Sequence, residues 1–390
     1  MATISSFWIV YLAVWIIISV AWWGFRAERF GVSGLPFYLL YRTTRLNKGI
    51  ERISAIAPNA WRTIWNLGIV IGVGSMVYIF YQLLLNVMNL FARSQQAVSV
   101  QPIVPVPGVF VSFETFPYLV LALSIVVASH ELSHGIASLA DHVPLKAAGL
   151  FFAHVLMGGF VEPDEETLNR ATSVTKLRIF AAGSTTNIIL GVFCVLLLSN
   201  FAATIAPFYN VVPAGVQIGT VPQNLPAYSS GLQAGDIVTS VNGTRISSIA
   251  DLRNAMLGVT PGQRIILGTQ NGSYIVKTGS DPSNSSHAII GISGLTDYIA
   301  YVPKLPFFSS GFPDVLAHSE YWLSVVLVSV ALINMLPMYP FDGDKFLDTL
   351  LNLFKIPRAK GIRSALNAAA YGLLFLNVGL SLLRFGFLRY

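Results

Sequence analysis

Residues Phe116–Ala140 read FPYLVLALSIVVASHELSHGIASLA and contain the pattern H-E-x-x-H from His130 to His134. Glu131 is the only acidic residue of this stretch, which has no Lys or Arg, so its length and composition predict a membrane-spanning helix. Residues i and i+4 share one face of a helix, so both imidazoles can bind one zinc ion. Glu131 can then act as a base toward a metal-bound water. Because ionisable side chains are costly in lipid and indicate function, the stretch predicts a protease that works inside a membrane.

The pattern has a simpler explanation, a pair of core histidines that hydrogen-bond to neighbouring helices. Burying His, Glu and His together in a membrane needs partners or a metal, which favours the metal. Catalytic zinc sites usually have three protein ligands and a water, so a third ligand must come from elsewhere in the sequence. It is not a cysteine, because the only one, Cys194, falls in another apolar run. A single cysteine also excludes an intrachain disulfide.

The composition indicates a membrane protein with several spans. The chain is 54% hydrophobic and 11% charged, whereas about a quarter of the residues of a soluble domain are charged. The first apolar run has no basic region before it and no clear cleavage site after it, so we interpret it as a retained span rather than a signal peptide. Six charge-poor runs are each near the length that a span needs: Phe7–Phe25, Leu67–Phe91, Pro117–Ala140, Ile179–Ala206, Tyr321–Met338 and Ala365–Leu383.

The basic residues follow the loops between these runs, so the net charge of +6 does not indicate a nucleic-acid partner. Lys and Arg gather between the first two spans, after the third span and before the last span, whereas Ser94–Phe116 has none. The positive-inside tendency therefore predicts an outside N-terminus and three cytoplasmic basic loops. Alternation then places Pro207–Glu320 outside the cytoplasm.

A soluble β-rich domain is expected between two membrane halves, from Asn210 to about Leu295. Short alternating segments, the hairpin signals Asn242-Gly243 and Asn271-Gly272, and a short helix at Ile249–Leu257 support it. Within it, Gly231–Gly243 reads GLQAGDIVTSVNG, which resembles the G-L-x-x-G-D-x-I-x-x-V-N-G stretch of PDZ domains. The resemblance implies a groove that takes an extended peptide or the C-terminus of a polypeptide as an added strand. The alternative is a lid or spacer that restricts access to the membrane site.

The segment Gly149–Val161 is apolar but too short to span, and glycines interrupt it, so it is expected to be re-entrant or interfacial. A β-like loop there could offer its edge to an unwound substrate, with Gly158, Gly159 and Phe160 as substrate-binding residues. The alternative is a plain amphipathic connector. His154 is interpreted as a polar loop residue rather than a ligand.

The third ligand is sought near the end of the fifth span, where residues 334–344 read NMLPMYPFDGD. Two prolines are expected to end the span there. Asp342 then lies at the cytoplasmic end of its span, at the same depth as the two histidines, and is our choice as third ligand. Asp344 and Asp348 are rivals that lie further into the basic loop. A turn or cap role for Asp342 is the alternative.

With these three elements the chain resembles the site-2 protease family of intramembrane zinc metalloproteases. The resemblance covers H-E-x-x-H in a span, N-x-x-P-x-x-x-x-D-G in a later span, and the PDZ-like insert. It implies one Zn²⁺ per chain, bound by His130, His134 and Asp342, with Glu131 as catalytic base. The family often has G-P-x-x-N in the span after the first motif, whereas this chain has Gly183-Ser184-Thr185-Thr186-Asn187. Whether the helix bends there is left open.

Asn187 and Asn334 are amides in predicted spans. Either could donate a hydrogen bond to a substrate carbonyl or an oxyanion, which makes both candidate catalytic residues. The alternative is an interhelical hydrogen bond.

The predicted fold is a polytopic α-helical membrane protein of about six spans, with an inserted β-rich PDZ-like soluble domain and a short re-entrant loop. Residues 1–92 form the N-terminal transmembrane helices and basic loop, 93–206 the first half of the catalytic core, 207–300 the PDZ-like domain, and 301–390 the second half. The expected partners are the bilayer, transmembrane protein substrates and a peptide C-terminus at the PDZ-like domain, without nucleic acid. The protein is expected to be a multi-pass integral membrane protein, in the cell membrane if prokaryotic, with the PDZ-like domain extracytoplasmic and the active site near the cytoplasmic side.

The predicted function is hydrolysis of peptide bonds within the transmembrane segments of membrane-anchored substrates, known as regulated intramembrane proteolysis. A non-catalytic membrane chaperone or adaptor that retains the protease fold is the alternative. A metal transporter is disfavoured, because the other five spans supply almost no further acidic or His residues.

Overall fold

The computed structural model describes residues 2–35, 37–103 and 105–387. It divides into two compact units, Met1–Ser199 with Ala317–Tyr390, here called the membrane unit, and Asn200–Leu316, here called the inserted domain. The four-way division expected from the sequence stays a prediction.

Six helices are long and apolar enough to cross a membrane, which confirms the predicted polytopic helical class. Gly183 to Asn187 lie inside one uninterrupted helix, so the helix continues through the segment where the family often has a proline. The fifth helix ends at Asn334, four residues earlier than predicted, because the backbone turns in the segment that contains Pro337 and Pro340. The six are α1 Ala2–Gly24, α3 Pro58–Phe91, α4 Phe116–Ala140, α6 Ser173–Ser199, α10 Phe312–Asn334 and α12 Ala359–Phe385.

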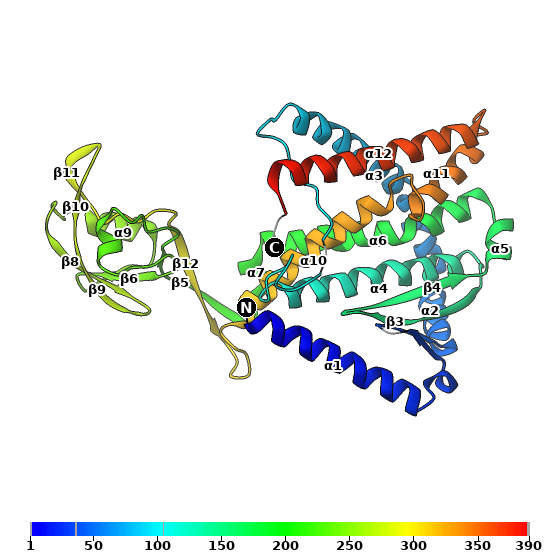
Figure 1. Cartoon of the computed structure of the whole chain (residues 1–390), viewed down its shortest axis with the longest axis horizontal. Coiled ribbons are helices and arrows are strands. Elements are labelled where there is room, and N and C mark those ends of the chain that lie inside the picture. The colour runs from blue at the N-terminus through cyan, green and yellow to red at the C-terminus, as the bar shows by residue number, and fades with distance from the viewer. Residues whose placement is uncertain (1, 36, 104, 388–390) are drawn as a thin grey trace. The chain divides into compact units, whose positions relative to one another are not determined.

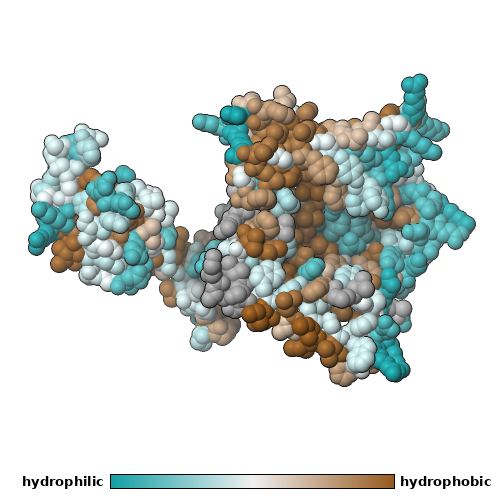
Figure 2. Space-filling view, in the orientation of Figure 1, coloured by the Kyte–Doolittle hydropathy of each residue, from teal (hydrophilic) through white to brown (hydrophobic). Residues whose placement is uncertain are grey.

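Apolar side chains cover much of the flanks of the membrane unit, and hydrophilic ones gather at its right-hand end in Figure 2. Many large apolar residues of the spanning helices are exposed, as in Ile17 of α1 and Phe375 of α12, at 67% and 70%. A soluble protein rarely exposes contiguous apolar surface on this scale, whereas lipid-facing helices do.

A four-stranded antiparallel sheet lies between α1 and α4 (Figure 1). Its order is β1 Val32–Leu35, β2 Tyr38–Arg42, β3 Leu145–Ala153 and β4 Leu156–Pro163. The sequence analysis allowed a β-like loop at Gly149–Val161, which forms most of the β3–β4 hairpin, and missed the first two strands. The register places Gly149 opposite Phe160, and a Cβ at Gly149 would overlap the Tyr41 carbonyl and the Phe160 ring. Glycine therefore permits this close pairing.

Small residues bring the remaining helices close together around α6. A Cβ at Gly68 of α3 would lie 2.7 Å from Oγ1 of Thr185, and one at Gly72 would lie 3.2 Å from the Phe346 ring of α11. Such close approach is typical of helix packing in membranes. The short elements of this unit are η1 Ala27–Phe30, α2 Thr44–Ile56, α5 Glu165–Arg170 and α11 Asp342–Leu353.

The inserted domain confirms the predicted β-rich architecture. Its six-stranded sheet has the order β12-β5-β6-β8-β9, with β7 paired to β6, and a separate hairpin joins β10 to β11. Asn242 and Gly243 both have positive φ, 50° and 82°, as a tight two-residue hairpin turn requires. The elements are α7 Phe201–Ile205, β5 Tyr209–Gln217, α8 Pro226–Ser229, β6 Ile237–Val241, β7 Thr244–Arg245, α9 Ile249–Met256, β8 Arg264–Thr269, β9 Gly272–Lys277, β10 Gly279–Asp281, β11 Asn284–Ile289 and β12 Thr296–Pro303.

Candidate metal centre

Three side chains from two distant stretches of the sequence meet beside α4. Nε2 of His130 lies 3.0 Å from Oδ2 of Asp342, and Nε2 of His134 lies 3.1 Å from the same oxygen. Both histidines are buried. The three candidate ligand atoms lie within 4.8 Å of one another. The structure therefore brings together the three residues proposed as zinc ligands.

Asp342 reaches this position because the backbone turns tightly after α10. Asp342 is the first residue of α11, and Phe341 before it is extended. Gly343 is buried against the carbonyl groups of Met335 and Leu336, which a Cβ would overlap. The glycine of the D-G pair thus permits the turn that carries the carboxylate to the histidines.

The α6 helix supports the two imidazoles along one stripe, at positions 179, 183 and 187. Nδ1 of His134 lies 2.7 Å from the Ile179 carbonyl oxygen, so this nitrogen must carry the proton and donate. A Cβ at Gly183 would lie 2.5 Å from the His130 ring, so the glycine leaves room for the imidazole. The spacing of four residues keeps all three positions on the face of α6 toward α4.

Asn187 lies fully buried between Ser129 and His130. Its amide group is 3.1 Å from Oγ of Ser129 and 3.3 Å from Nδ1 of His130. Oδ1 of Asn187 accepts from the Ser129 hydroxyl, and its Nδ2 faces Nδ1 of His130, so the amide group orients the His130 ring. In neutral His134, the proton on Nδ1 leaves the Nε2 lone pair free.

The donor set fits a divalent cation. Two Nε2 atoms and one carboxylate oxygen converge at close range, and each of the three atoms can offer a lone pair to a metal ion. Two imidazoles and one carboxylate are a common protein ligand set for catalytic zinc.

A cavity of about 200 Å³ opens beside these atoms. Glu131 and Asn334 line it together with His130 and Asp342. Nδ2 of Asn334 lies 3.5 Å from Nε2 of His130. An acid–base group and an amide donor therefore border the same space as the candidate ligands, with room for water and a peptide group.

The strand β4 lies against α4 next to this cavity. Oε2 of Glu131 accepts a long hydrogen bond, 3.4 Å, from the Val161 amide. A Cβ at Gly158 would lie 3.0 Å from Val127, and one at Gly159 would lie 3.9 Å from Ala128. Gly158 therefore lets β4 approach the helix one turn before His130, whereas a side chain at position 159 would make only ordinary contact with it. The Phe160 ring packs over Gly149 of β3 instead.

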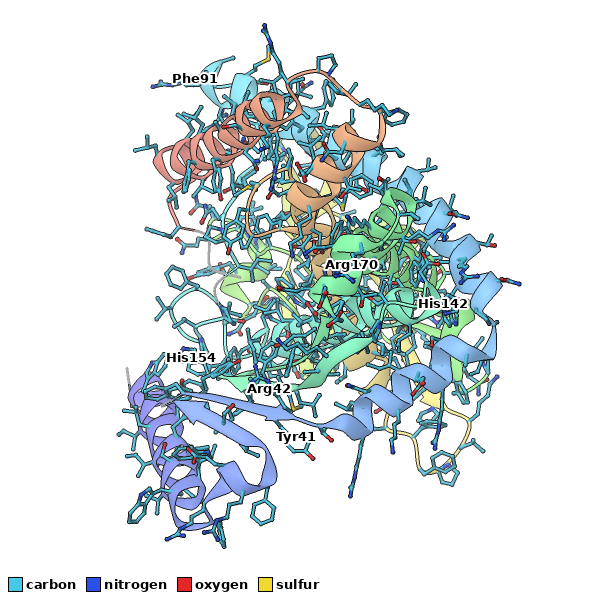
Figure 3. The ribbon with its side chains drawn as sticks, turned by 90° about the vertical axis from the view of Figure 1, so that its right-hand side faces the viewer. Tyr41, Arg42, Phe91, His142, His154 and Arg170 are labelled. Atoms are coloured by element: carbon cyan, nitrogen blue, oxygen red, sulfur yellow. The ribbon has the colours of Figure 1, made fainter. Side chains whose placement is uncertain are left out.

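Neither rival aspartate joins the three ligands. The guanidinium of Arg363 holds the Asp344 carboxylate at 2.8 and 2.6 Å, and these hydrogen bonds keep the pKa of Asp344 below its usual range. Asp348 lies 3.2 Å from the same guanidinium. His154 lies beside α1 (Figure 3), 3.0 Å from the Tyr11 hydroxyl, as a polar loop residue.

Several supporting residues escaped the sequence analysis. The Ile179 carbonyl has no side-chain signal, and the role of Gly183 requires the ring of a residue that lies 53 positions earlier in the numbering. A half-buried cluster at the end of α4 was also missed, in which Asp141 pairs with Arg62 and Arg178 at 2.9 and 3.0 Å.

The sequence profile of peptidase family M50 matches residues 118–377. An uncharacterized protein of Methanocaldococcus jannaschii is 25% identical over 340 residues, 86% of this chain and 82% of that protein. A membrane-bound transcription factor site-2 protease homolog of Arabidopsis thaliana is 26% identical over 212 residues, 54% of this chain and 40% of the relative. A putative zinc metalloprotease of Clostridium acetobutylicum is 24% identical over 211 residues, 47% of this chain and 59% of the relative. The matches thus span less than two thirds of the two relatives with named activities.

Among solved structures, the protein is similar to the PDZ domains of SdrC-like proteins from Listeria monocytogenes and Listeria innocua. These are 23% and 21% identical, both with a TM-score of 0.19. Each match covers 20% of this chain, and 85% and 91% of the respective domain.

Proposed function

This chain belongs to peptidase family M50, the site-2 protease family of intramembrane zinc metalloproteases, and on that premise we propose that it cuts membrane-anchored proteins within their transmembrane segments. The observation that carries the proposal is the meeting of two imidazole nitrogens and one carboxylate oxygen beside a cavity that Glu131 and Asn334 line.

One Zn²⁺ per chain would be held by His130, His134 and Asp342. When bound, it lowers the pKa of a water to about 7 and polarises a carbonyl group. The Ile179 carbonyl group keeps Nδ1 of His134 protonated, so its Nε2 is available as a ligand, and the Asn187 amide orients the His130 ring. The three ligands come from rigid helices, which favours a fixed geometry.

Glu131 acts as general base and then as general acid. Its carboxylate borders the cavity and takes a proton from the attacking water, which it later gives to the leaving amine. The Asn334 amide lies on the same cavity and donates a hydrogen bond to the developing oxyanion. Asn187 is fully buried behind His130, which supports a positioning role for it rather than contact with substrate.

The β4 edge holds the substrate in an extended form. A helical substrate must unwind before its carbonyl groups become accessible, and an exposed strand edge can pair with the released backbone. The outer edge of β4 pairs with no strand among the described residues. Its contacts with Ser124 and Glu131 are long, both at 3.4 Å, so a substrate strand can replace them. Gly158 and Gly159 lie at this edge, and Phe160 belongs to the same strand.

The inserted domain binds an extended peptide or the C-terminus of a polypeptide on the extracytoplasmic side, and the metal centre lies near the cytoplasmic side. Its PDZ-like sequence supports peptide binding. A cavity of about 360 Å³ between α9 and residues 288–292, lined by Leu252, Met256 and Ile290, offers a groove.

The test compares wild type with Glu131→Gln, both purified in detergent. Zinc content is measured together with cleavage of a transmembrane reporter peptide. The proposal predicts one zinc per chain in both proteins and cleavage only by wild type. Glu165→Gln, on an exposed residue of α5, is the matched control and should cleave normally. Cleavage by Glu131→Gln would overturn its role, and zinc without cleavage in wild type would favour a non-catalytic adaptor.

A further inference from the structure

We infer that α2 is an interfacial helix whose outer surface binds anionic phospholipid headgroups. We call this surface the α2 lipid face; it consists of a basic stripe, Arg45, Lys48 and Arg52, and an apolar stripe, Leu46, Ile53 and Ile56. All six side chains are exposed. The inference does not depend on the proteolytic activity.

The inner face of α2 fixes how the helix is oriented. Ile50 and Ser54 are buried, at 6% and 5% exposure. Ile50 packs against α4, where its Cγ2 lies 3.2 Å from the position of a Cβ at Gly135. The helix therefore cannot rotate to hide its outer stripes against the protein.

The two outer stripes differ in chemistry and lie side by side. On a helix of 3.6 residues per turn, Leu46 and Ile53 fall on the flank between the buried face and the basic stripe. Leu46 is 37% exposed, Ile53 36% and Ile56 80%. A helix with an apolar flank and a basic face is typical of segments that lie in the headgroup region of a bilayer.

The position of α2 in the sequence also supports a location in the headgroup region. It directly precedes α3, which is long and apolar enough to span. The indole N–H of Trp61, in the first turns of α3, donates to the Ile53 carbonyl oxygen at 3.0 Å. Trp residues are enriched at membrane–water interfaces, so this bond ties α2 to the boundary of the bilayer.

The direction of the helix is also suitable. Figure 3 looks along the direction in which α4 and α6 extend in Figure 1, and α2 runs across that view, from near Tyr41 and Arg42 toward His142. A helix that crosses the ends of spanning helices lies roughly in the membrane plane.

The basic stripe selects the charge of the lipid. Among the ion pairs of the described residues, none involves Arg45, Lys48 or Arg52, whereas the neighbouring Arg42 pairs with Glu162 at 3.4 Å. Cations next to a bilayer attract anionic headgroups, and three on one face act together. The phosphate of a zwitterionic lipid is neutralised by its own amine, so phosphatidylglycerol is the better probe than phosphatidylcholine.

The experiment measures amide hydrogen exchange of residues 44–56 in the full-length protein. The protein is placed in nanodiscs of phosphatidylcholine alone, or of phosphatidylcholine with a quarter phosphatidylglycerol. We expect the anionic lipid to slow exchange in this segment by roughly tenfold, because it stabilises the docked helix. Raising the salt concentration should reduce the effect.

The triple variant Arg45→Gln, Lys48→Gln, Arg52→Gln should lose the response to phosphatidylglycerol. The control variant Lys355→Gln, Arg358→Gln, Lys360→Gln removes three exposed positive charges from the loop after α11 and the first turn of α12 and should keep it. Unchanged hydrogen exchange of the spanning helices shows that both variants are folded. If the triple variant is not folded, the single variant Arg52→Gln replaces it and should show a weaker response to phosphatidylglycerol.

Equal exchange of residues 44–56 in the two lipid mixtures would overturn the inference. So would a full response in the triple variant. Protection that requires an added acidic protein, and not anionic lipid, would assign the surface to a protein partner and would also overturn it.

Discussion

Two helix–helix interfaces of the membrane unit contain buried polar side chains: the α3–α12 interface, with Asn86 and Asn377, and the α4–α6 interface, with His130, His134 and Asn187. They differ in what their polar groups can bind. Between α3 and α12, Nδ2 of Asn86 donates to Oδ1 of Asn377 at 2.8 Å. The side-chain oxygen Oδ1 of Asn86 accepts from the backbone N–H of Val98 at 2.8 Å, and Nδ2 of Asn377 donates to the backbone carbonyl oxygen of Leu83 at 2.9 Å. Donors and acceptors match, so this interface needs nothing more.

The polar residues of the α4–α6 interface also form hydrogen bonds, but its two histidines additionally point toward the Asp342 carboxylate. Ile179 and Asn187 contact the Nδ1 atoms of the two histidines, and both Nε2 atoms converge on Oδ2 of Asp342. Buried polarity alone therefore does not mark the site. The convergence of two imidazole nitrogens and one carboxylate oxygen beside a cavity does, because that donor set fits a divalent cation.

Removing one of those candidate ligands should have the largest effect. Asp342→Asn keeps the size of the side group but removes its charge. We expect at least about a 100-fold loss of zinc affinity and loss of detectable cleavage, because a ligand is worth more than the residues that orient it. Zinc competition with a chelator measures the affinity. Asp348→Asn is the matched control, and equal loss in both would contradict the assignment of Asp342.

Adding a methyl group next to the His130 ring should have the next largest effect on zinc binding. Gly183→Ala places a Cβ 2.5 Å from the His130 ring, so the ring must move. Zinc affinity should fall roughly 10- to 100-fold, as for loss of an outer-shell partner, with the spanning helices still folded. Gly74→Ala in α3, where a Cβ meets nothing within 4 Å, should bind zinc like wild type. Normal affinity in Gly183→Ala would show that the ring is not held there.

Asn187 separates a positioning role from a catalytic one. Asn187→Ala should lower zinc affinity about tenfold, because His130 loses the partner of its Nδ1. At saturating zinc, the turnover number should recover most of its value. If turnover stays low while zinc affinity is normal, Asn187 acts on the substrate instead.

A substitution at the α3–α12 interface should lower the stability of the protein without changing metal binding. Asn377→Ala leaves the Asn86 amide without one buried partner, so we expect a loss of about 1–2 kcal/mol in the free energy of unfolding. Thermal unfolding in detergent measures it. Zinc affinity of the folded protein should be unchanged, and a parallel loss of zinc would mean that the two interfaces are coupled.

The sequence revealed the parts of this fold that local patterns encode. The apolar run around His130 and Glu131 predicts both the helix and its metal-binding face, and the prolines before Asp342 predict the turn that delivers it. The hairpin turn at Asn242-Gly243 was correctly predicted for the same reason, since Asn-Gly favours positive φ. The second hairpin exists, but Thr269 pairs with Gly272, so it turns at Gln270-Asn271, one residue earlier than the Asn271-Gly272 signal.

The missed features depend on distant contacts. Tyr38–Arg42 forms a strand because it pairs with β3, more than a hundred residues later, and its own five residues carry no clear alternation. The group that binds His134 is the backbone carbonyl of Ile179. Every residue type has such a group, so the sequence does not reveal this hydrogen bond. The orienting role of Asn187 became visible only when α4 and α6 were placed side by side.

The most direct test is X-ray absorption at the zinc edge of the purified full-length protein. The account predicts one zinc per chain, with two imidazole nitrogens and oxygen ligands at about 2.0–2.1 Å, and a spectrum that loses one imidazole in His134→Ala. A zinc environment that is the same in wild type and in His134→Ala, or wild-type protein that binds no zinc while it cleaves substrate, would contradict it.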